Sequence, residues 1–174
     1  DLTGVETSGN KIRKLEYSLA EALREGADLV ITCGGIQSNH CRATAYAAAR
    51  LSLKCCLLLR GNEAGEPREG NYFLDKLVGA DIVIRDPAVF HGHANELMEE
   101  IAETYRAQGY RPYIIPMGAS NGIGTFGYIH CMEEILAQEQ AMGLNFDTLV
   151  DAVGSGGTYA GLYAGAQLLS AGKR

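Results

Sequence analysis

Apolar residues recur along this chain at two different spacings. Where they lie three and four positions apart they predict helices, which cover residues 15–25, 39–50, 71–78, 93–108, 124–142 and 158–171. Short apolar runs predict strands at residues 28–33, 54–59, 81–85, 111–116 and 147–153. Because helices and strands alternate, we expect an α/β fold: a parallel sheet with helices on both faces, in an open three-layer sandwich. The polar stretch 61–70 is expected to be a mobile surface loop.

Composition narrows the classes of function. The chain has 174 residues, 47% of them hydrophobic, which is enough for one buried core. Its formal net charge is −6 and it has no long run of Lys or Arg, so we expect no nucleic-acid partner. The apolar runs are too short to span a bilayer and no signal peptide opens the chain, so we expect a cytoplasmic protein with a small-molecule substrate. Five cysteines without framework spacing predict free thiols.

The first candidate for chemistry is the sequence SGNKIRKLE at residues 8–16. It places three cations at the start of a predicted helix, where the helix macrodipole disfavours positive charge. Taken alone, the segment is best interpreted as a solvated helix start. In the functional alternative, Lys14 meets a phosphate group and Lys11 is an amine nucleophile toward a carbonyl.

The second candidate is the loop GGIQSNH at residues 34–40, which follows a predicted strand and precedes a predicted helix. Ligands in open α/β folds bind at this edge of the sheet. Capping of the helix explains one polar residue, Ser38 or Asn39. It does not explain why all four residues from Gln37 to His40 are polar, so the loop is a candidate substrate site.

The third candidate is the turn VGSGGT at residues 153–158, again between a predicted strand and a predicted helix. Its glycines would let the backbone approach an anion closely, with the amides of the helix start pointing at it. The turn is therefore a candidate phosphate site, although it could equally open a dinucleotide site or merely reverse the chain. It is not a P-loop, because no Lys-Ser or Lys-Thr pair follows the glycines.

Two further features are weaker candidates. The sequence HGH at residues 91–93 could hold a metal, but no further ligand recurs at a suitable spacing nearby, so a surface loop is favoured and we expect no metal. Cys41 lies in an apolar helix, where a small buried residue is a commoner explanation than a thiol nucleophile.

Together and in this order, the three segments resemble the pyridoxal-phosphate-dependent family of D-cysteine desulfhydrase and 1-aminocyclopropane-1-carboxylate deaminase, which has the tryptophan-synthase-β-like fold (fold type II). The stretch RPYIIPMGASN at residues 111–121 resembles the desulfhydrase branch. The resemblance implies that residues 1–20 begin a large region with the cofactor lysine. It also implies that residues 21–120 form a smaller α/β domain with the substrate loop, and that residues 121–174 return to the large domain with the phosphate loop.

The resemblance also implies a role for each candidate residue. The cofactor would be pyridoxal 5'-phosphate, with Lys11 forming the internal Schiff base and Lys14 at the phosphate. Neighbouring cations and partial burial would lower the pKa of Lys11, as an imine requires. Asn39 would bind the ring's phenolic oxygen, and Ser38 joins Lys11 as a catalytic candidate. The phosphate would be wrapped by Ser155, Gly156, Gly157 and Thr158. The substrate would meet Gln37, Ser38, Asn39 and His40.

The implied reaction is β-elimination from a small amino acid, with Lys11 as the base for the Cα proton. D-cysteine, giving pyruvate, ammonia and hydrogen sulfide, is favoured because His40 and the turn GSGGT resemble the desulfhydrase branch. The loop after Arg60 also lacks the aromatic-rich insertion associated with the deaminases. Deamination of 1-aminocyclopropane-1-carboxylate and L-cysteate sulfo-lyase activity remain alternatives. We also expect a homodimer, because an apolar sheet edge left uncovered after Val153 would favour association.

Two rival interpretations remain open. A nicotinamide-dependent Rossmann enzyme could be built on the turn at residues 154–156, but it would leave Lys11 and the loop 34–40 without a role. The chain could also be a non-catalytic remnant that folds and binds only phosphate-bearing small molecules, or nothing. This second rival is kept open by a start at Asp1 without a Met and an end at Arg174 soon after an apolar helix. The resemblance itself implies a strand before Asp1 and a large section after Arg174.

Overall fold

The centre of the molecule is a four-stranded parallel sheet. The structure is a computed structural model that describes residues 8–62, 69–169 and 172–173, so residues 63–68 of the predicted surface loop lie outside it. The strands pair in the order β3-β2-β1-β4. Their bounds are Leu29–Gly35 for β1, Lys54–Arg60 for β2, Asp81–Arg85 for β3 and Pro112–Ile114 for β4.

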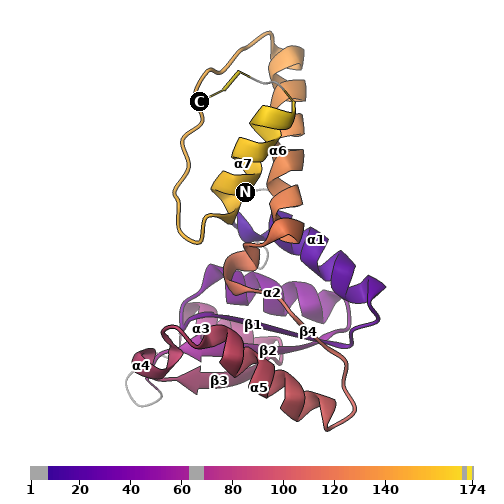
Figure 1. Cartoon of the computed structure of the whole chain (residues 1–174), viewed down its shortest axis with the longest axis vertical. Coiled ribbons are helices and arrows are strands. Elements are labelled where there is room, and N and C mark those ends of the chain that lie inside the picture. Colours follow the sequence, from indigo (N-terminus) through magenta and orange to yellow (C-terminus); the bar gives the residue numbers. More distant parts are fainter. Residues whose placement is uncertain (1–7, 63–68, 170–171, 174) are drawn as a thin grey trace.

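Helices cover both faces of this sheet (Figure 1). On one face lie α1 (Lys11–Arg24), α2 (Asn39–Arg50) and α3 (Gly70–Leu77), and on the other lie α4 (Pro87–Phe90) and α5 (Ala94–Arg106). Both faces of the central strands are therefore buried. In β1, Val30 points toward α1 and α2, whereas Leu29 and Ile31 point toward α5. The predicted α/β class, a parallel sheet between two helical layers, is confirmed.

The remaining helices project away from the sheet as a pair (Figure 1). The long helix α6 (Gly122–Met142) packs against α7 (Gly157–Leu168) and against α1. Gly161 of α7 makes this close packing possible, because a Cβ there would lie 2.4 Å from the Cβ of Tyr128. Within the part of the chain that the structure describes, no helix combines the length and apolar character needed to cross a membrane.

The predicted strand at residues 147–153 is wrong. This segment is extended but forms no ladder with any described strand, and Val150 is 95% exposed. A strand requires a neighbour that exchanges backbone hydrogen bonds with it, and the sheet lies elsewhere in the molecule. The segment runs instead beside α7, where a hollow of about 490 Å³ is lined by apolar side chains including Val153 and Tyr163.

Smaller differences concern the ends of elements. Helix α1 begins at Lys11, four residues before its predicted start at residue 15, so both candidate lysines are helical. The short helix α4 was not predicted, and its start is capped by Asp86, whose side chain accepts from the Ala88 amide. The last predicted helix ends at Leu168, and positions 170–171 of its predicted range lie outside the described residues.

Candidate functional site

The two lysines of α1 lie in its first turn, and Lys14 is the more buried. Its side chain is 0% exposed, and Nζ donates a hydrogen bond to Ser120 Oγ at 3.2 Å. Among the described residues no carboxylate lies within ion-pair distance of it. Burial and the nearby charge of Lys11 lower the pKa of Lys14 to about 8, with Asp151 acting in the opposite direction. Lys14 is thus a buried cation whose charge is not balanced by a close anion.

Lys11 lies one turn earlier and is only partly buried. Its Nζ donates to Asn10 Oδ1 at 3.0 Å, and Asn10 Nδ2 in turn donates to Thr158 Oγ1 at 3.0 Å. Burial lowers the pKa of Lys11, while the charge of Asp151 raises it. The start of α1 and the start of α7 are therefore joined by hydrogen bonds that include the Lys11 amine.

The glycine-rich turn opens α7 with its first amides uncapped. Gly156 has a φ of 85°, a left-handed conformation that favours glycine, and α7 begins at the next residue. No side chain caps this helix start. Ser155 Oγ lies 2.7 Å from Ser120 Oγ, so a row of hydroxyl groups leads from the turn to Lys14. Uncapped amides, hydroxyl groups and a buried cation are the donors that bind a phosphate.

Ser120 had no role in the sequence analysis, and it is a residue on which the site depends. It follows a tight turn in which Gly118 and Ala119 have φ values of 67° and 48°. Ser120 lies so close to Gly157 that a Cβ at Gly157 would be 2.5 Å from its Oγ. The glycines at residues 118 and 122 gave a signal for a turn here, but nothing in the sequence showed that Ser120 faces Lys14.

These groups surround a small hollow. It is lined by Asn10, Lys11, Lys14 and residues 151–159, and its volume is about 20 Å³. That is room for about one water molecule, which is less than a phosphate group occupies. The chemistry of the donors fits an anion: the side-chain donors now bond to neighbouring side chains, whereas the first amides of α7 have no side-chain cap.

The loop at residues 34–40 is organised around α2 and α3. Ser38 caps α2 by accepting from the Cys41 amide at 3.2 Å. Asn39 Oδ1 accepts from Asn71 Nδ2 at 2.9 Å, and Gln37 Oε1 accepts from the Asn71 amide at 2.8 Å. Gln37, Ser38 and Asn39 make no hydrogen bond with either α1 lysine in the described part of the chain.

His40 lies beneath this loop, inside the protein. It is 3% exposed, and its Nε2 lies 2.8 Å from Thr32 Oγ1. Because the Thr32 hydroxyl donates to the Ile115 carbonyl at 2.7 Å, it accepts from Nε2, which therefore carries the proton. Burial, together with the charges of Lys11 and Lys14, lowers the pKa of His40 to about 3. His40 is thus a neutral imidazole at physiological pH.

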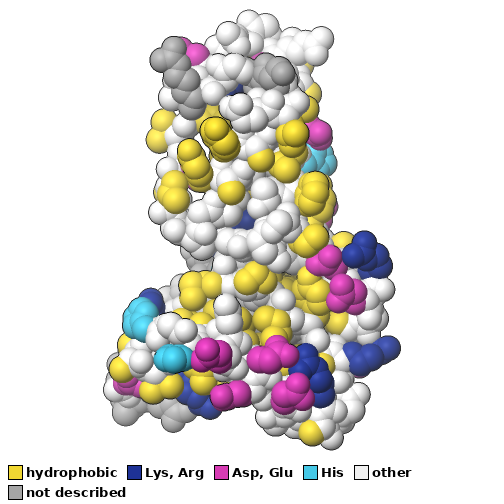
Figure 2. Space-filling view, in the orientation of Figure 1, with side chains coloured by type: hydrophobic (Ala, Val, Ile, Leu, Met, Phe, Trp, Pro, Cys, Tyr) yellow, Lys and Arg dark blue, Asp and Glu magenta, His cyan; other side chains and the backbone are white. Residues whose placement is uncertain are grey.

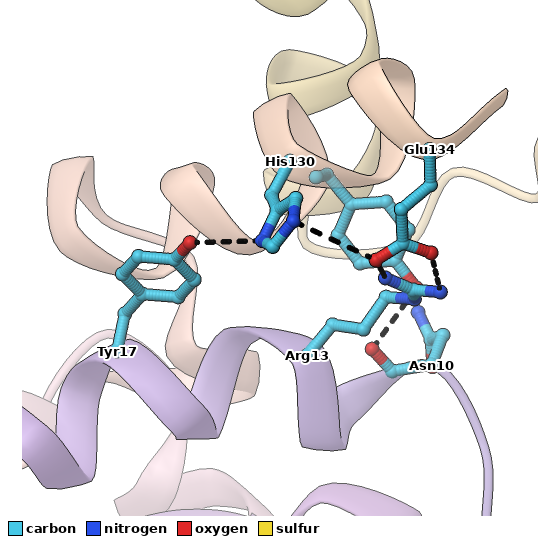
Figure 3. Close-up of polar contacts among 6 residues, drawn as sticks. Asn10, Arg13, Tyr17, His130 and Glu134 are labelled. Atoms are coloured by element: carbon cyan, nitrogen blue, oxygen red, sulfur yellow. Dashed lines mark hydrogen bonds and ion pairs between the residues drawn. The ribbon is translucent and has the colours of Figure 1, made fainter. Parts of the chain in front are cut away.

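A second network holds α1 against α6 (Figure 3). Arg13 donates to both carboxylate oxygens of Glu134, at 2.9 and 2.8 Å, and His130 lies 3.9 Å from the same carboxylate. Tyr17 contacts His130 at 3.3 Å. The Arg13 and Glu134 side chains are 38% and 37% exposed, so the pair contributes only about 0.5 kcal/mol. The pair links the start of α1 to α6, next to the two lysines.

The two weaker candidates have ordinary structural explanations. His93 Nδ1 lies 2.7 Å from Glu96 Oε2 at the start of α5, and no cluster of three or more potential metal ligands occurs among the residues described. Cys41 is 0% exposed, and burial raises the pKa of its thiol.

Comparison with known proteins identifies relatives along the whole chain. The sequence model of a family described as pyridoxal-phosphate dependent enzymes matches residues 1–173. A Pyrococcus abyssi protein, provisionally named a 1-aminocyclopropane-1-carboxylate deaminase, is 48% identical over 174 residues, which are 98% of this chain and 51% of that protein. A Yersinia pestis D-cysteine desulfhydrase is 44% identical over 177 residues, covering 97% of this chain and 51% of that protein.

Solved structures agree with this result. The crystal structure of a homologue of 1-aminocyclopropane-1-carboxylate deaminase superposes with a TM-score of 0.88 at 44% identity, covering 100% of this chain and 51% of that chain. A threonine deaminase from T.th. superposes with a TM-score of 0.65 at 26% identity, covering 91% of this chain and 46% of that chain. The chain thus spans about half the length of the relatives it matches.

Proposed function

The chain belongs to the family of pyridoxal-phosphate dependent enzymes, and on that premise we propose that it forms the cofactor-holding part of an enzyme that releases ammonia from a small amino acid. In this proposal Lys11 is the lysine that holds the cofactor covalently. The observation that carries it is Lys14, a fully buried cation without a close anion, which lies beside the uncapped start of α7.

The phosphate of the cofactor would meet the donors around this hollow. Lys14 would supply the charge, and the uncapped α7 amides and the turn side chains would supply hydrogen bonds. A phosphate dianion there would also favour the charged form of Lys14, which burial now disfavours. The residues proposed to wrap the phosphate are Ser155, Gly156, Gly157 and Thr158.

Lys11 would have two tasks. To bind a carbonyl covalently, its amine must be neutral, and burial already lowers its pKa. When bound, pyridoxal phosphate supplies an electron sink for negative charge at the Cα of an amino acid. The amine of Lys11 would then take up the Cα proton as a general base.

The loop at residues 34–40 would hold the substrate side of the site. Because Asn71 donates to Asn39 Oδ1, the Asn39 amide is oriented and its Nδ2 is left to donate to the ring's phenolic oxygen. Ser38 and Gln37 would receive the substrate carboxylate, with Ser38 as a catalytic candidate. His40 would support this loop from below as a neutral imidazole.

The favoured substrate is D-cysteine, converted with water to pyruvate, ammonia and hydrogen sulfide. A relative named D-cysteine desulfhydrase supports it, and a relative named for 1-aminocyclopropane-1-carboxylate supports the principal alternative. An assay of the cofactor-loaded protein separates the candidates by product: sulfide from D-cysteine, 2-oxobutanoate from the cyclopropane substrate and sulfite from L-cysteate. Loss of the product in Lys11→Ala is the control. A protein that captures the cofactor but releases none of these products would contradict the substrate proposal and favour a non-catalytic remnant.

We also propose that residues 1–20 and 121–174 belong to one region of the protein and residues 21–120 to another. We further propose that the protein is a cytoplasmic homodimer. On the face shown in Figure 2, most charged side chains gather over the half with the sheet, while few lie over the α6 and α7 half, where apolar side chains are scattered. Val150, Val153 and Leu168 are 95%, 62% and 71% exposed. Burying them between two copies would be favourable. Sedimentation should show a dimer that Val150→Lys weakens, and a monomer at high concentration would contradict the proposal.

A further inference from the structure

Asn10 occupies the N-cap position of α1 but does not cap the helix. An asparagine at this position ordinarily has an extended backbone and accepts from an amide of the first turn. Asn10 has φ −70° and ψ −12°, a helical conformation, and its side chain makes no capping hydrogen bond. Its polar groups are therefore available for other contacts.

Three polar groups of Asn10 make hydrogen bonds to side chains around the start of α1. The side-chain Oδ1 accepts from Lys11 Nζ at 3.0 Å, and Nδ2 donates to Thr158 Oγ1 at 3.0 Å. The main-chain oxygen accepts from the Tyr128 hydroxyl at 3.0 Å. Asn10 thus joins α1 to both α6 and α7, at the end of α1 where Figure 3 shows it.

We propose that Asn10 is a positioning residue, a neutral acceptor that aims the Lys11 amine at the start of α7 without adding a charge beside it. The inference rests on the proposed function, because it assumes that Lys11 is the cofactor lysine. A carboxylate at this position would also accept from Nζ, but it would stabilise the ammonium form and so oppose attack on a carbonyl. An amide orients the amine and leaves its protonation to the surroundings.

The charges around Lys11 show why a neutral partner matters. Lys14 lies one turn along the same helix, and the charge of Lys11 helps to lower the pKa of Lys14. His40, packed on the α2 side, is uncharged at physiological pH. Asp151, from the segment before α7, favours the ammonium form. A second carboxylate at position 10 would act with Asp151, so the amine would become neutral only at a higher pH.

The test compares Asn10→Asp with Asn10→Ala in the cofactor-free protein. Acetylation of Lys11 by trace acetic anhydride, located by mass spectrometry, gives the pH midpoint at which its amine becomes reactive. We expect Asn10→Asp to raise this midpoint by about one pH unit, as an added carboxylate within hydrogen-bond distance does. Asn10→Ala should leave the midpoint near that of the wild type but slow pyridoxal phosphate capture several-fold, because the amine is no longer aimed. An unchanged midpoint in Asn10→Asp, or unchanged capture in Asn10→Ala, would overturn the inference.

Tyr128→Phe supplies an independent arm if the position 10 variants fold poorly. It removes a hydroxyl that donates to the Asn10 main-chain oxygen and also interacts with the Thr158 side chain. Capture should slow while the Lys11 midpoint stays in place, and capture at the wild-type rate would contradict the positioning role. The outcomes also separate the two proposals. If the wild type captures no cofactor on Lys11, the proposed function fails, whereas the acetylation midpoint of Asn10→Asp tests Asn10 without any cofactor.

Discussion

Substitution of Gly127 by alanine tests whether the contact between α1 and α6 positions the lysines. Gly127 lies where the two helices meet. A Cβ there would be 2.2 Å from the Arg13 carbonyl oxygen, 2.5 Å from its carbonyl carbon and 3.0 Å from the Lys14 nitrogen. All three obstacles are backbone atoms, so no side-chain rotation can relieve the clash, and α1 must move away from α6.

The expected cost follows from this geometry. Overpacking typically destabilises by 1–3 kcal/mol, and a clash with rigid backbone belongs at the upper end, about 3 kcal/mol. Alanine has an intrinsic advantage over glycine in a helix of about 0.5–1 kcal/mol, which offsets only a part. Gly122→Ala is the matched control, because Gly122 is in the same helix and a Cβ there would meet no atom within 4 Å.

Urea unfolding followed by circular dichroism measures both variants. We expect Gly127→Ala to lose about 2–3 kcal/mol in the free energy of unfolding, while Gly122→Ala is unchanged or slightly more stable. The amount of pyridoxal phosphate captured should fall in Gly127→Ala even in the absence of urea, because Lys11 moves with α1. Equal stability and equal capture in the two variants would refute the account of the α1–α6 contact.

Two further predictions concern buried charges. Burial lowers the pKa of Lys14 to about 8, so between pH 8 and 10.5 the unfolded chain binds more protons and the native state gains stability as pH rises. Lys14→Met should lack this gain in parallel urea titrations. An identical pH dependence of stability in wild type and variant would contradict a lowered pKa of Lys14. Asp75 is 0% exposed, its carboxylate oxygens lack hydrogen-bond partners in the described part, and burial raises its pKa to about 7 despite Arg42. The wild type should therefore lose stability from about pH 4 to pH 7. Asp75→Asn should be more stable than the wild type by on the order of 2 kcal/mol at pH 7.5 but not at pH 4. Equal stability of the two proteins at pH 7.5 would contradict the burial argument.

Local patterns were sufficient for most of the fold. The strands β1 and β2 are buried on both faces, so their sequences are continuous apolar runs that differ clearly from the amphipathic helices around them. The strand predicted at residues 147–153 has a similar apolar pattern. It fails because a strand also depends on a neighbour, which a local pattern cannot reveal.

The candidate site was predictable only as separate pieces. Lys14 and the turn at residues 154–157 could be found because a helix start and a glycine-rich turn have local signatures. Their meeting in one hollow depends on tertiary contacts, such as the Lys14–Ser120 hydrogen bond across 106 residues and the Asn10–Thr158 hydrogen bond across 148. No spacing rule connects such positions, so Asn10 and Ser120 gained their roles only from the structure.

The most direct test of the central claim is to locate captured pyridoxal phosphate on the chain. The protein is incubated with the cofactor, the bond to lysine is fixed by borohydride reduction, and the labelled peptide is identified by mass spectrometry. We expect a label on Lys11, absent in Lys11→Ala and suppressed by inorganic phosphate, which competes for the donors around Lys14. A label on other lysines, or one that persists in Lys11→Ala, would contradict it.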